Sequence, residues 1–322
     1  MIMTPWLSVI IPVHMGERFL PATLASAAAE DPVGVEFRIY NSGEDEGAAR
    51  RAAAPYFDRM DIIWEDVPHL QPWTAKTNKG VREARAPHVI MLHQDDLWLA
   101  GHLTAVRNAL NSWPEATMSI ATSRFVAVDG RLLGAWRLPF APGLYDGRAL
   151  WDTLLVQNSI AIPSPVIQRD AWLACGGMNE ALWYTADWDL YLKLMKLGEI
   201  AVRESITTGF RVHGGSLTMK GGRDPAAFRD QFEIVLRNHS EAIELLPSAT
   251  KQKIRASITV NCALAAASAG DFSNLMAAFL AIAKLGPHSA VSYIQESRIL
   301  DRLAPRLKLI LCREQINRPE KN

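Results

Sequence analysis

The sequence has little cysteine and no excess of charge. Its three cysteines, Cys175, Cys262 and Cys312, are widely spaced and form no CxxC pair. This pattern argues against a disulfide framework or a zinc site and indicates a reducing cytosol. The 34 basic residues balance the 34 acidic ones, so the formal net charge is zero. A chain without net positive charge has no general electrostatic attraction for nucleic acid, and we expect no nucleic-acid partner.

Long hydrophobic runs and the common nucleotide fingerprints are also missing. No apolar run approaches the roughly 18 residues that span a bilayer. Residues 7–13 are apolar but lack a basic leader and contain Pro12, so we expect a strand and no signal peptide. Neither GxGxxG after this strand nor GxxxxGK[ST] anywhere is present. A dinucleotide-binding oxidoreductase and a P-loop protein are therefore disfavoured.

What is present is an alternation of apolar runs and helical segments. We expect strands at residues 7–13, 35–40, 61–64, 89–92, 119–128 and 160–167, with helices at 18–29, 73–85 and 187–197. Asp129-Gly130 predicts a hairpin turn. The alternation predicts an α/β fold with a mostly parallel sheet flanked by helices. Because the chain of 322 residues exceeds one typical domain and turns helical late, we expect a domain at 1–222 and a C-terminal α-helical region at 223–322.

Adjacent carboxylates follow the predicted strand at residues 89–92. The segment reads His93-Gln94-Asp95-Asp96-Leu97-Trp98. In open α/β sheets, ligands bind beyond the carboxyl ends of the strands, where these acids fall. Two neighbouring acids could hold a divalent cation and, through it, a phosphate. Alternatively, one of them caps the helix that begins near Ala100.

Six segments in register resemble family 2 glycosyltransferases, of the bacterial polysaccharide and glycoconjugate type. The segments are SVIIPVHMGE at 8–17, NKG at 78–80, VIMLHQDDLW at 89–98, CGGMNE at 175–180, ADWDL at 186–190 and FRVH at 210–213. The resemblance implies a GT-A fold, a nucleotide-sugar donor with UDP-sugars favoured, and inverting transfer of a hexosyl group. The acceptor would be a hydroxyl of a glycan or a lipid-linked molecule.

The resemblance also implies a divalent metal, Mn²⁺ or Mg²⁺. Asp95 stands at the position of the main metal carboxylate, and His213 at one that often completes the site. His93 replaces the usual first acid. Its softer imidazole could favour Mn²⁺, or it could bind a ribose hydroxyl or a phosphate instead. For His213 the alternative is an ordinary histidine at a strand end.

Asp187 stands at the position of the family's catalytic base, which takes the proton of the acceptor hydroxyl. The alternative is an acid that stabilises the dipole of the helix it begins. Ala186 replaces the family's preceding acid, for which Asp189 could substitute from another direction. Trp183 and Trp188 could stack on an acceptor sugar, or they could pack in the core.

The donor would be bound by residues from several of the matched segments. These residues are Pro12, His14, Glu17, Asn41, Lys76, Asn78, His93, Gln94 and Asp95. The family's DDGS loop is Tyr40-Asn41-Ser42-Gly43 here, with Tyr40 in place of an acid. Thr77 stands in place of the family's arginine, which leaves Lys76 as the nearest cation for the diphosphate. Lys76 could instead lie on a solvated helix face. These departures keep a second class open, a catalytically inactive sugar-binding or scaffold protein of the same fold.

The end of the chain suggests contacts with other molecules. Residues 263–285 resemble a helix-turn-helix unit that should pack on the main domain or on another chain, the latter as in a homodimer. The segment 300–321 mixes Leu and Ile with six basic residues. It could lie on a membrane surface, contact a protein partner, or be a solvated terminal helix. We expect a cytoplasmic protein, peripheral at the inner face of the membrane if that contact forms. A glycine-flanked loop at 214–222 could close over the donor.

Overall fold

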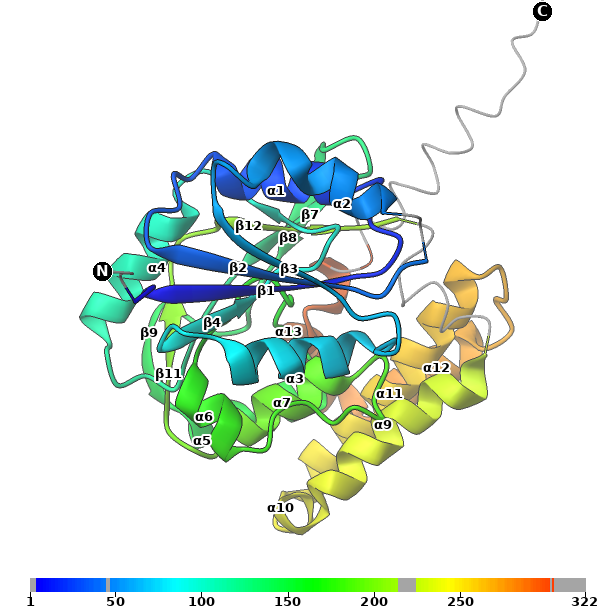
Figure 1. The fold of residues 1–322 in the computed structure, drawn as a ribbon. Helices are drawn as coiled ribbons and strands as arrows, with labels where there is room; N and C mark the ends of the chain where they lie inside the picture. The colour runs from blue at the N-terminus through cyan, green and yellow to red at the C-terminus, as the bar shows by residue number, and fades with distance from the viewer. Residues whose placement is uncertain (1–3, 45–46, 214–223, 302, 304–322) are drawn as a thin grey trace, which may run out of the picture.

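The computed structural model describes residues 4–44, 47–213, 224–301 and 303. The closing loop expected at 214–222 and nearly all of the basic segment at 300–321 lie outside these ranges, so both remain predictions. The described chain folds around a large twisted sheet, with helices on its faces and a group of helices at its C-terminal end (Figure 1).

The large sheet has eight strands in the order β3-β2-β1-β4-β10-β6-β11-β9. Their bounds are Leu7–Val13 for β1, Val35–Asn41 for β2, Asp61–Asp66 for β3, His88–Met91 for β4, Met118–Ala121 for β6, Gly143–Asp146 for β9, Val166–Gln168 for β10 and Glu199–Arg203 for β11. Strands β1 to β4 pair in parallel, and β6 with β11, whereas β10 and β9 run antiparallel to their neighbours. Every residue of β1 and β2 is buried, as expected for strands covered on both faces.

A smaller sheet of four strands lies beside the large one, in the order β5-β12-β7-β8. The bounds are Leu97–Trp98 for β5, Ser123–Val126 for β7, Leu132–Trp136 for β8 and Thr208–Arg211 for β12. The predicted hairpin at Asp129-Gly130 is confirmed, and Gly130 takes a φ of 88° that favours glycine. The predicted single strand at 119–128 is in fact two. The Ser164 hydroxyl bonds the N–H and C=O of Ala121, so the first strand ends there and the chain crosses to the second sheet.

The predicted strand at 160–167 is largely wrong. Only its last two residues enter β10, because Pro163 and Pro165 have no N–H to give to a ladder. Residues 161–164 form a turn instead, in which the N–H of Ser164 donates to the C=O of Ala161 at 2.9 Å.

Helices cover both faces of the large sheet. They are α1 (Leu20–Ala28), α2 (Ala48–Ala53), α3 (Trp73–Glu83), α4 (His102–Ser112), α5 (Gly147–Val156), α6 (Arg169–Ala174) and α7 (Ala186–Leu194). Gly80 lets α3 lie close on the sheet, since a Cβ there would come within 2.5 Å of the Ile10 side chain and 2.9 Å of Tyr40. The predicted helices are confirmed with ends shifted by a few residues, and α7 ends at Leu194 rather than Leu197.

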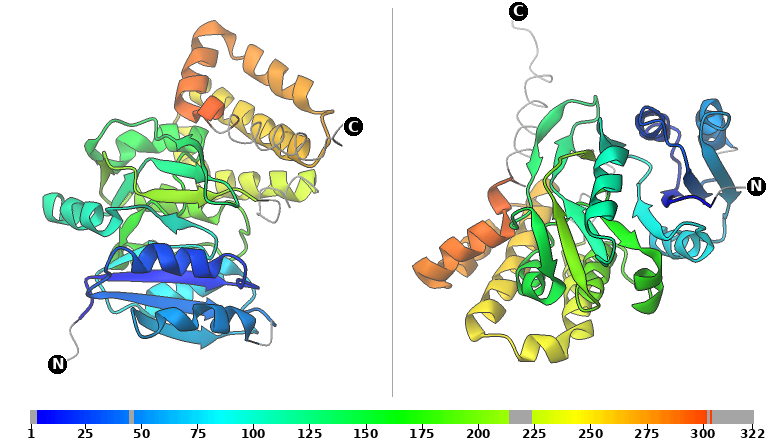
Figure 2. Two further views of the ribbon diagram at one scale, coloured as in Figure 1. Left: turned by 90° about the horizontal axis from the view of Figure 1, so that it is seen from above. Right: turned by 90° about the vertical axis from the view of Figure 1, so that its left-hand side faces the viewer.

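The C-terminal helices are α9 (Pro225–Asn238), α10 (Ser240–Glu244), α11 (Ser248–Ser268), α12 (Leu275–Ala283) and α13 (Gly286–Ser297). They lie at the end of the molecule away from the N-terminal strands (Figure 2). Val235 of α9 and Ile258 of α11 belong to the same hydrophobic cluster as Trp188 of α7. The predicted helix pair therefore packs on the main domain. The domain boundary at 222/223 stays a prediction.

The outer surface of α12 is unusually apolar. Met276 and Phe279 are about two-thirds exposed, at 65% and 66%. Within the described ranges no single helix is long and apolar enough to cross a membrane; α12 and α13 pass such a test only as a pair bent by 118°.

Candidate active site

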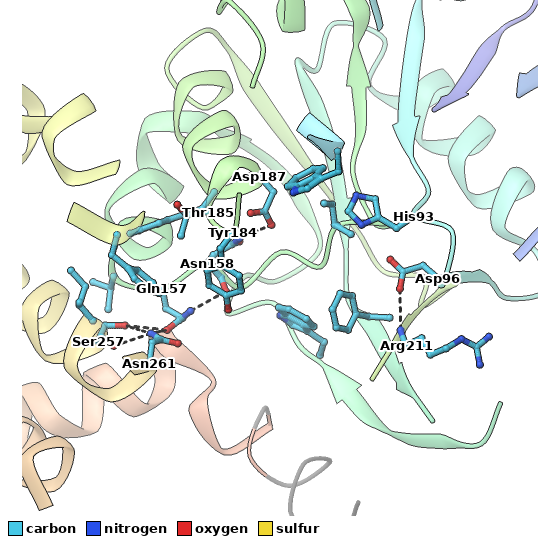
Figure 3. A pocket seen from close by; sticks show the side chains of 18 of the residues that line it. His93, Asp96, Gln157, Asn158, Tyr184, Thr185, Asp187, Arg211, Ser257 and Asn261 are labelled. Atoms are coloured by element: carbon cyan, nitrogen blue, oxygen red, sulfur yellow. Dashed lines mark hydrogen bonds between the residues drawn. The ribbon is translucent and has the colours of Figure 1, made fainter. Parts of the chain in front are cut away.

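A pocket lies between the acidic loop after β4 and the first turn of α7 (Figure 3). His93, Asp95 and Asp96 line one side of it, and Asp187 lines the wall across from them. The first group follows β4, and β12 supports it, because the N–H of Arg211 at the end of β12 donates to Asp96. The two carboxylates that the sequence pattern singles out, Asp95 and Asp187, thus face one cavity.

The acidic loop has the composition of a cation site. Ligand atoms of His93, Asp95 and Asp96 all lie within 4.8 Å of one another. His213 reaches the same group from just beyond β12, with its Nε2 2.7 Å from Oδ2 of Asp95. The sequence places these four residues on segments more than 100 positions apart, and the fold brings them together.

The electrostatics of the loop also fit a divalent cation. Asp96 is buried, one of its oxygens accepts the N–H of Arg211 at 3.0 Å, and Oδ2 has no partner within the described chain. Burial and the adjacent Asp95 raise the pKa of Asp96 well above its ordinary value. Nε2 of His93 is likewise buried without a partner among described atoms. Orphaned polar atoms beside paired carboxylates are what a bound cation would satisfy.

Asp95 is held in its charged form. Burial would raise its pKa, but the hydrogen bond with His213 and the charges of His93 and His213 outweigh burial and lower the pKa. Arg211 fixes the loop: its Nε donates to the C=O of Asp95 at 2.7 Å, and its Nη1 donates to Ala127 and Val128. Sequence reasoning matched Arg211 within the FRVH segment but gave it no role.

The helix-cap alternative for Asp95 and Asp96 is wrong. Helix α4 begins at His102, and its first amides donate to the carboxylate of Glu30. The N–H of Gly101 lies 2.9 Å from Oε1, and that of Leu103 lies 3.0 Å from Oε2. Glu30 comes from the turn after α1, 71 residues away from Gly101. Asp95 and Asp96 therefore do not cap α4.

Replacing Glu30 with alanine should consequently lower the free energy of unfolding by about 1–2 kcal/mol, because two helix-end amides and a favourable dipole contact are lost. Urea denaturation followed by circular dichroism measures this change. Glu115→Ala, which removes an exposed glutamate, is the control and should leave the midpoint unchanged. Equal midpoints for the two variants would show that Glu30 does not cap α4.

Asp187 sits in the first turn of α7 and faces the pocket. Burial raises the pKa of Asp187 to about 6, even though Nδ2 of Asn158 donates to its Oδ2 at 3.0 Å. Ala186, in place of the family's acid, is fully buried and is not among the residues that line the pocket. Asn158 is a partner that sequence reasoning missed, since it lies 29 residues before Asp187 in a segment without a motif.

Asp189 does not substitute for the missing acid. It is buried on another side of α7 and bonds His239, Asn238 and Lys193. Burial acts to raise its pKa, but these partners outweigh burial and lower the pKa to about 2. This carboxylate stabilises the packing of α7 on α9.

The two acceptor tryptophans have different positions. Trp188 lines the pocket, although its indole N–H donates to the C=O of Leu154 and it is 3% exposed. Trp183 is not among the lining residues, and its ring packs on Tyr184 and Phe228. Tyr184, which the sequence also places beside Asp187, lines the pocket, and so do four aromatic rings that sequence reasoning did not assign: Trp73, Trp136, Phe210 and Phe232.

Most of the proposed donor residues lie outside this pocket. The residues concerned are Pro12, His14, Glu17, Asn41, Lys76, Asn78 and Gln94. His14 and Glu17 are exposed, and the Gln94 side chain bonds the N–H and C=O of His14 at 2.8 and 3.1 Å. Pro12, the last but one residue of β1, lies opposite Tyr40, and Asn41 bonds Asp66 and the N–H of Gly43. Their donor contacts stay predictions.

Lys76 and Asn78 have structural partners. The solvated-face alternative for Lys76 is wrong: its side chain is 1% exposed, and Nζ donates to the C=O of Val13 and the hydroxyl of Ser42, each at 2.7 Å. Burial lowers the pKa of Lys76 to about 8. The Asn78 amide bonds both backbone groups of Met178 and the carboxylate of Glu180, so it ties α3 to the segment before α7.

Comparison with known proteins agrees with the motifs. No family model matches the chain. An uncharacterized glycosyltransferase of Rickettsia felis is 25% identical over 225 residues, 65% of this chain and 34% of that protein. One of Rickettsia prowazekii is 21% identical over 67% of each chain. The chain thus spans about a third of the length of some relatives and two thirds of others.

Solved structures confirm the fold. TarS 1-349 of S. aureus in complex with UDP-GlcNAc superposes with a TM-score of 0.61 at 16% identity, over 80% of this chain and 72% of that one. The mannosyltransferase PcManGT of Pyrobaculum calidifontis, in complex with GDP-Man and Mn²⁺, gives 0.54 at 16% identity, over 96% and 84%. The predicted GT-A fold and the resemblance to glycosyltransferases are therefore confirmed.

Proposed function

We propose that this protein is a metal-dependent inverting glycosyltransferase. It moves a hexosyl group from a nucleotide-diphosphate sugar, UDP-sugars being favoured, to a hydroxyl of a glycan or lipid-linked acceptor. The observation that carries the proposal is the pairing of Asp95 and Asp187 across one pocket with opposite pKa shifts. Environments that push the pKa values of two acids apart are typical of sites that assign them different roles.

Asp187 is the general base in this proposal. The acceptor oxygen bonds to the anomeric carbon, its proton passes to an oxygen of Asp187, and the bond from the anomeric carbon to the diphosphate oxygen breaks. The nucleoside diphosphate leaves with the electron pair. With a pKa of about 6, Asp187 is mostly ionised at pH 7 yet more basic than an ordinary aspartate. Asn158 orients the carboxylate through its amide hydrogen.

Asp95, His93 and Asp96 would hold the cation, with His213 bonded to Asp95. A Mn²⁺ or Mg²⁺ ion there supplies neutralisation of the charge that develops on the diphosphate. Arg211 keeps the loop in place by its bonds to Asp95 and Asp96. The neighbour PcManGT, with GDP-Man and Mn²⁺, and TarS, with UDP-GlcNAc, support a donor of this class.

Calorimetry followed by a transfer assay tests the proposal. Titration with UDP-GlcNAc and GDP-mannose, in Mn²⁺ and again in EDTA, should show donor binding that needs the metal. Release of free nucleoside diphosphate should then follow when acceptors are added. Metal-dependent binding with neither hydrolysis nor transfer would favour the inactive sugar-binding protein, which the departures at Tyr40, Thr77, His93 and Ala186 leave as the second candidate.

The pH dependence of turnover should follow Asp187. At saturating donor and Mn²⁺, kcat should rise tenfold per pH unit below about 6 and level off above it, because the base must be ionised. Stopped assays between pH 4.5 and 8.5 measure this profile. A profile that levels off near pH 4 would mean that a carboxyl group with an ordinary pKa, or none, acts as base.

Location and partners stay predictions. Cytoplasmic location, contact with the inner face of the membrane or with a protein, and dimer formation have no direct support in the described residues. The exposed apolar surface of α12 is consistent with such a contact.

A further inference from the structure

The pocket does not end at Asp187 but continues to the C-terminal helices. Gln157, at the end of α5, and Ser257 and Asn261, on α11, line its far part. These side chains are 6%, 2% and 7% exposed. In Figure 3 they lie on the opposite side of Asp187 and Asn158 from His93 and Asp96. The helical region therefore contributes directly to the cavity.

The three residues form one hydrogen-bonded cluster. Oε1 of Gln157 accepts the hydroxyl of Ser257 at 3.0 Å and Nδ2 of Asn261 at 2.7 Å. Nδ2 of Asn261 also donates to the C=O of Ser257, which fixes the amide on its helix. The next residue in the chain, Asn158, bonds Asp187. A continuous polar strip thus runs from the general base to α11, with its side chains already oriented.

The charge of the pocket differs between its two parts. Among the lining residues that the structure describes, the acidic and basic ones are His93, Asp95, Asp96, Asp187 and Arg211. The described far part offers neutral amides, hydroxyls and apolar side chains. An anionic group there would lose its hydration without gaining a cation, which disfavours its binding. This part of the pocket consequently suits a neutral ligand with hydroxyl groups.

Aromatic rings complete this surface. Tyr184 and Phe232 line the pocket with centroids 6.1 Å apart, and Phe232 lies 5.9 Å from Trp188. Aromatic faces offer the apolar side of a sugar ring a flat surface, while amides bond the hydroxyls at its rim. A sugar ring bound on this surface would have its nearest hydroxyl beside Asp187.

We propose that Gln157, Ser257 and Asn261 form an acceptor subsite that binds a neutral pyranose of a saccharide acceptor. The proposal rests on the function proposed above and narrows its acceptor class. Helix α11 then determines acceptor specificity, and the C-terminal region is part of the active site. Free lipid alcohols, phosphorylated sugars and uronic acids should all be poorer acceptors than neutral glycosides.

The test uses the full chain with the donor that calorimetry selects. Acceptors are p-nitrophenyl glycosides of glucose, galactose, mannose and N-acetylglucosamine, their glucuronide and 6-phosphate counterparts, and decanol. We expect at least one neutral glycoside to exceed its charged counterparts and decanol by tenfold or more in kcat/KM. A charged sugar or decanol as the best acceptor would overturn the proposal.

Substitution then locates the subsite. Asn261→Leu should raise the acceptor KM about tenfold, since one hydrogen bond in a buried site is lost, while the Kd of UDP or GDP with Mn²⁺ stays within twofold. Ser257→Ala, a smaller change, should raise the acceptor KM a few-fold and keeps the test decisive if Asn261→Leu does not fold. Gln252→Leu, on an exposed position of α11, is the matched control.

The outcomes separate the two proposals. An unchanged acceptor KM in Ser257→Ala and in folded Asn261→Leu would overturn the subsite but leave the glycosyltransferase intact. Equal rises in the acceptor KM and in the Kd of the nucleotide would show that these residues have a structural role, and would also overturn the subsite. A wild type that binds donor but never transfers sugar would refute the enzymatic function, and the subsite with it.

Discussion

Replacing Asp187 with asparagine lowers kcat by a factor on the order of 10²–10⁴, because the acceptor hydroxyl loses its base. The amide keeps the size of the carboxylate, and its oxygen can still accept the Asn158 hydrogen bond. Donor binding should therefore change little. Initial rates of nucleoside-diphosphate release at saturating donor and acceptor measure the effect. Turnover within threefold of wild type would remove Asp187 from the base role.

The same variant should be more stable than wild type. The folded pKa of Asp187 is about 6, above its ordinary 3.8, so ionisation at neutral pH costs stability. The cost is absent below pH 4, grows as pH rises through this window and is complete above pH 6. Asp187→Asn should thus gain about 1–3 kcal/mol at pH 7.5 and nothing at pH 3.5. Loss of turnover together with this gain cannot be ascribed to misfolding.

Asp189→Asn is the matched control on the same helix. The folded pKa of Asp189 is about 2, so its ionised form stabilises the protein above pH 4, and this contribution is lost as pH falls towards 2. The variant should lose stability at neutral pH, because His239 and Lys193 lose their anionic partner. Turnover per folded molecule should remain near that of wild type. The two substitutions would then have opposite effects on stability, and only Asp187→Asn would lower the rate.

Replacing Asp95 with asparagine abolishes the metal dependence of donor binding. The side chain keeps its shape but loses the charge that attracts a divalent cation. The Kd of the donor in Mn²⁺ should become equal to its Kd in EDTA, and turnover should fall below detection. Isothermal titration with and without Mn²⁺ measures both constants. Asp129→Asn, at an exposed carboxylate bonded to Arg131, is the control and should retain the metal effect. A retained metal effect in Asp95→Asn would reject its role as ligand.

Local sequence patterns were sufficient to predict an element or a site where burial is uniform along a strand or where a motif is compact. Strand β1 has the predicted bounds Leu7–Val13, because an unbroken apolar run can only be covered on both faces. The adjacent acids after β4 were found because they follow a buried strand, whereas Asp187 was identified only by the resemblance of the ADWDL segment. The predicted strand at 160–167 was wrong because two prolines outweigh its apolar composition.

Contacts between distant segments were beyond local patterns. Glu30 caps α4 although it lies 71 residues before Gly101 in the sequence. Nothing in either segment predicts this contact. Gln157 and Asn261 form a hydrogen bond although they are 104 residues apart in the sequence. No local pattern predicts that α11 packs on α5 and forms the far wall of the pocket. Lysine is usually a surface residue, so nothing in the sequence indicated that Lys76 is buried. Gly80 allows α3 to pack close to the sheet, and the Lys76 side chain is buried there.

A crystal structure of the Asp187→Asn variant with an intact UDP-sugar or GDP-mannose and Mn²⁺ tests the central claim most directly. We expect an anomalous manganese peak at the carboxylate of Asp95 and an anomeric carbon that faces residue 187 across the pocket. A manganese peak elsewhere, or a donor whose sugar points away from residue 187, would contradict it.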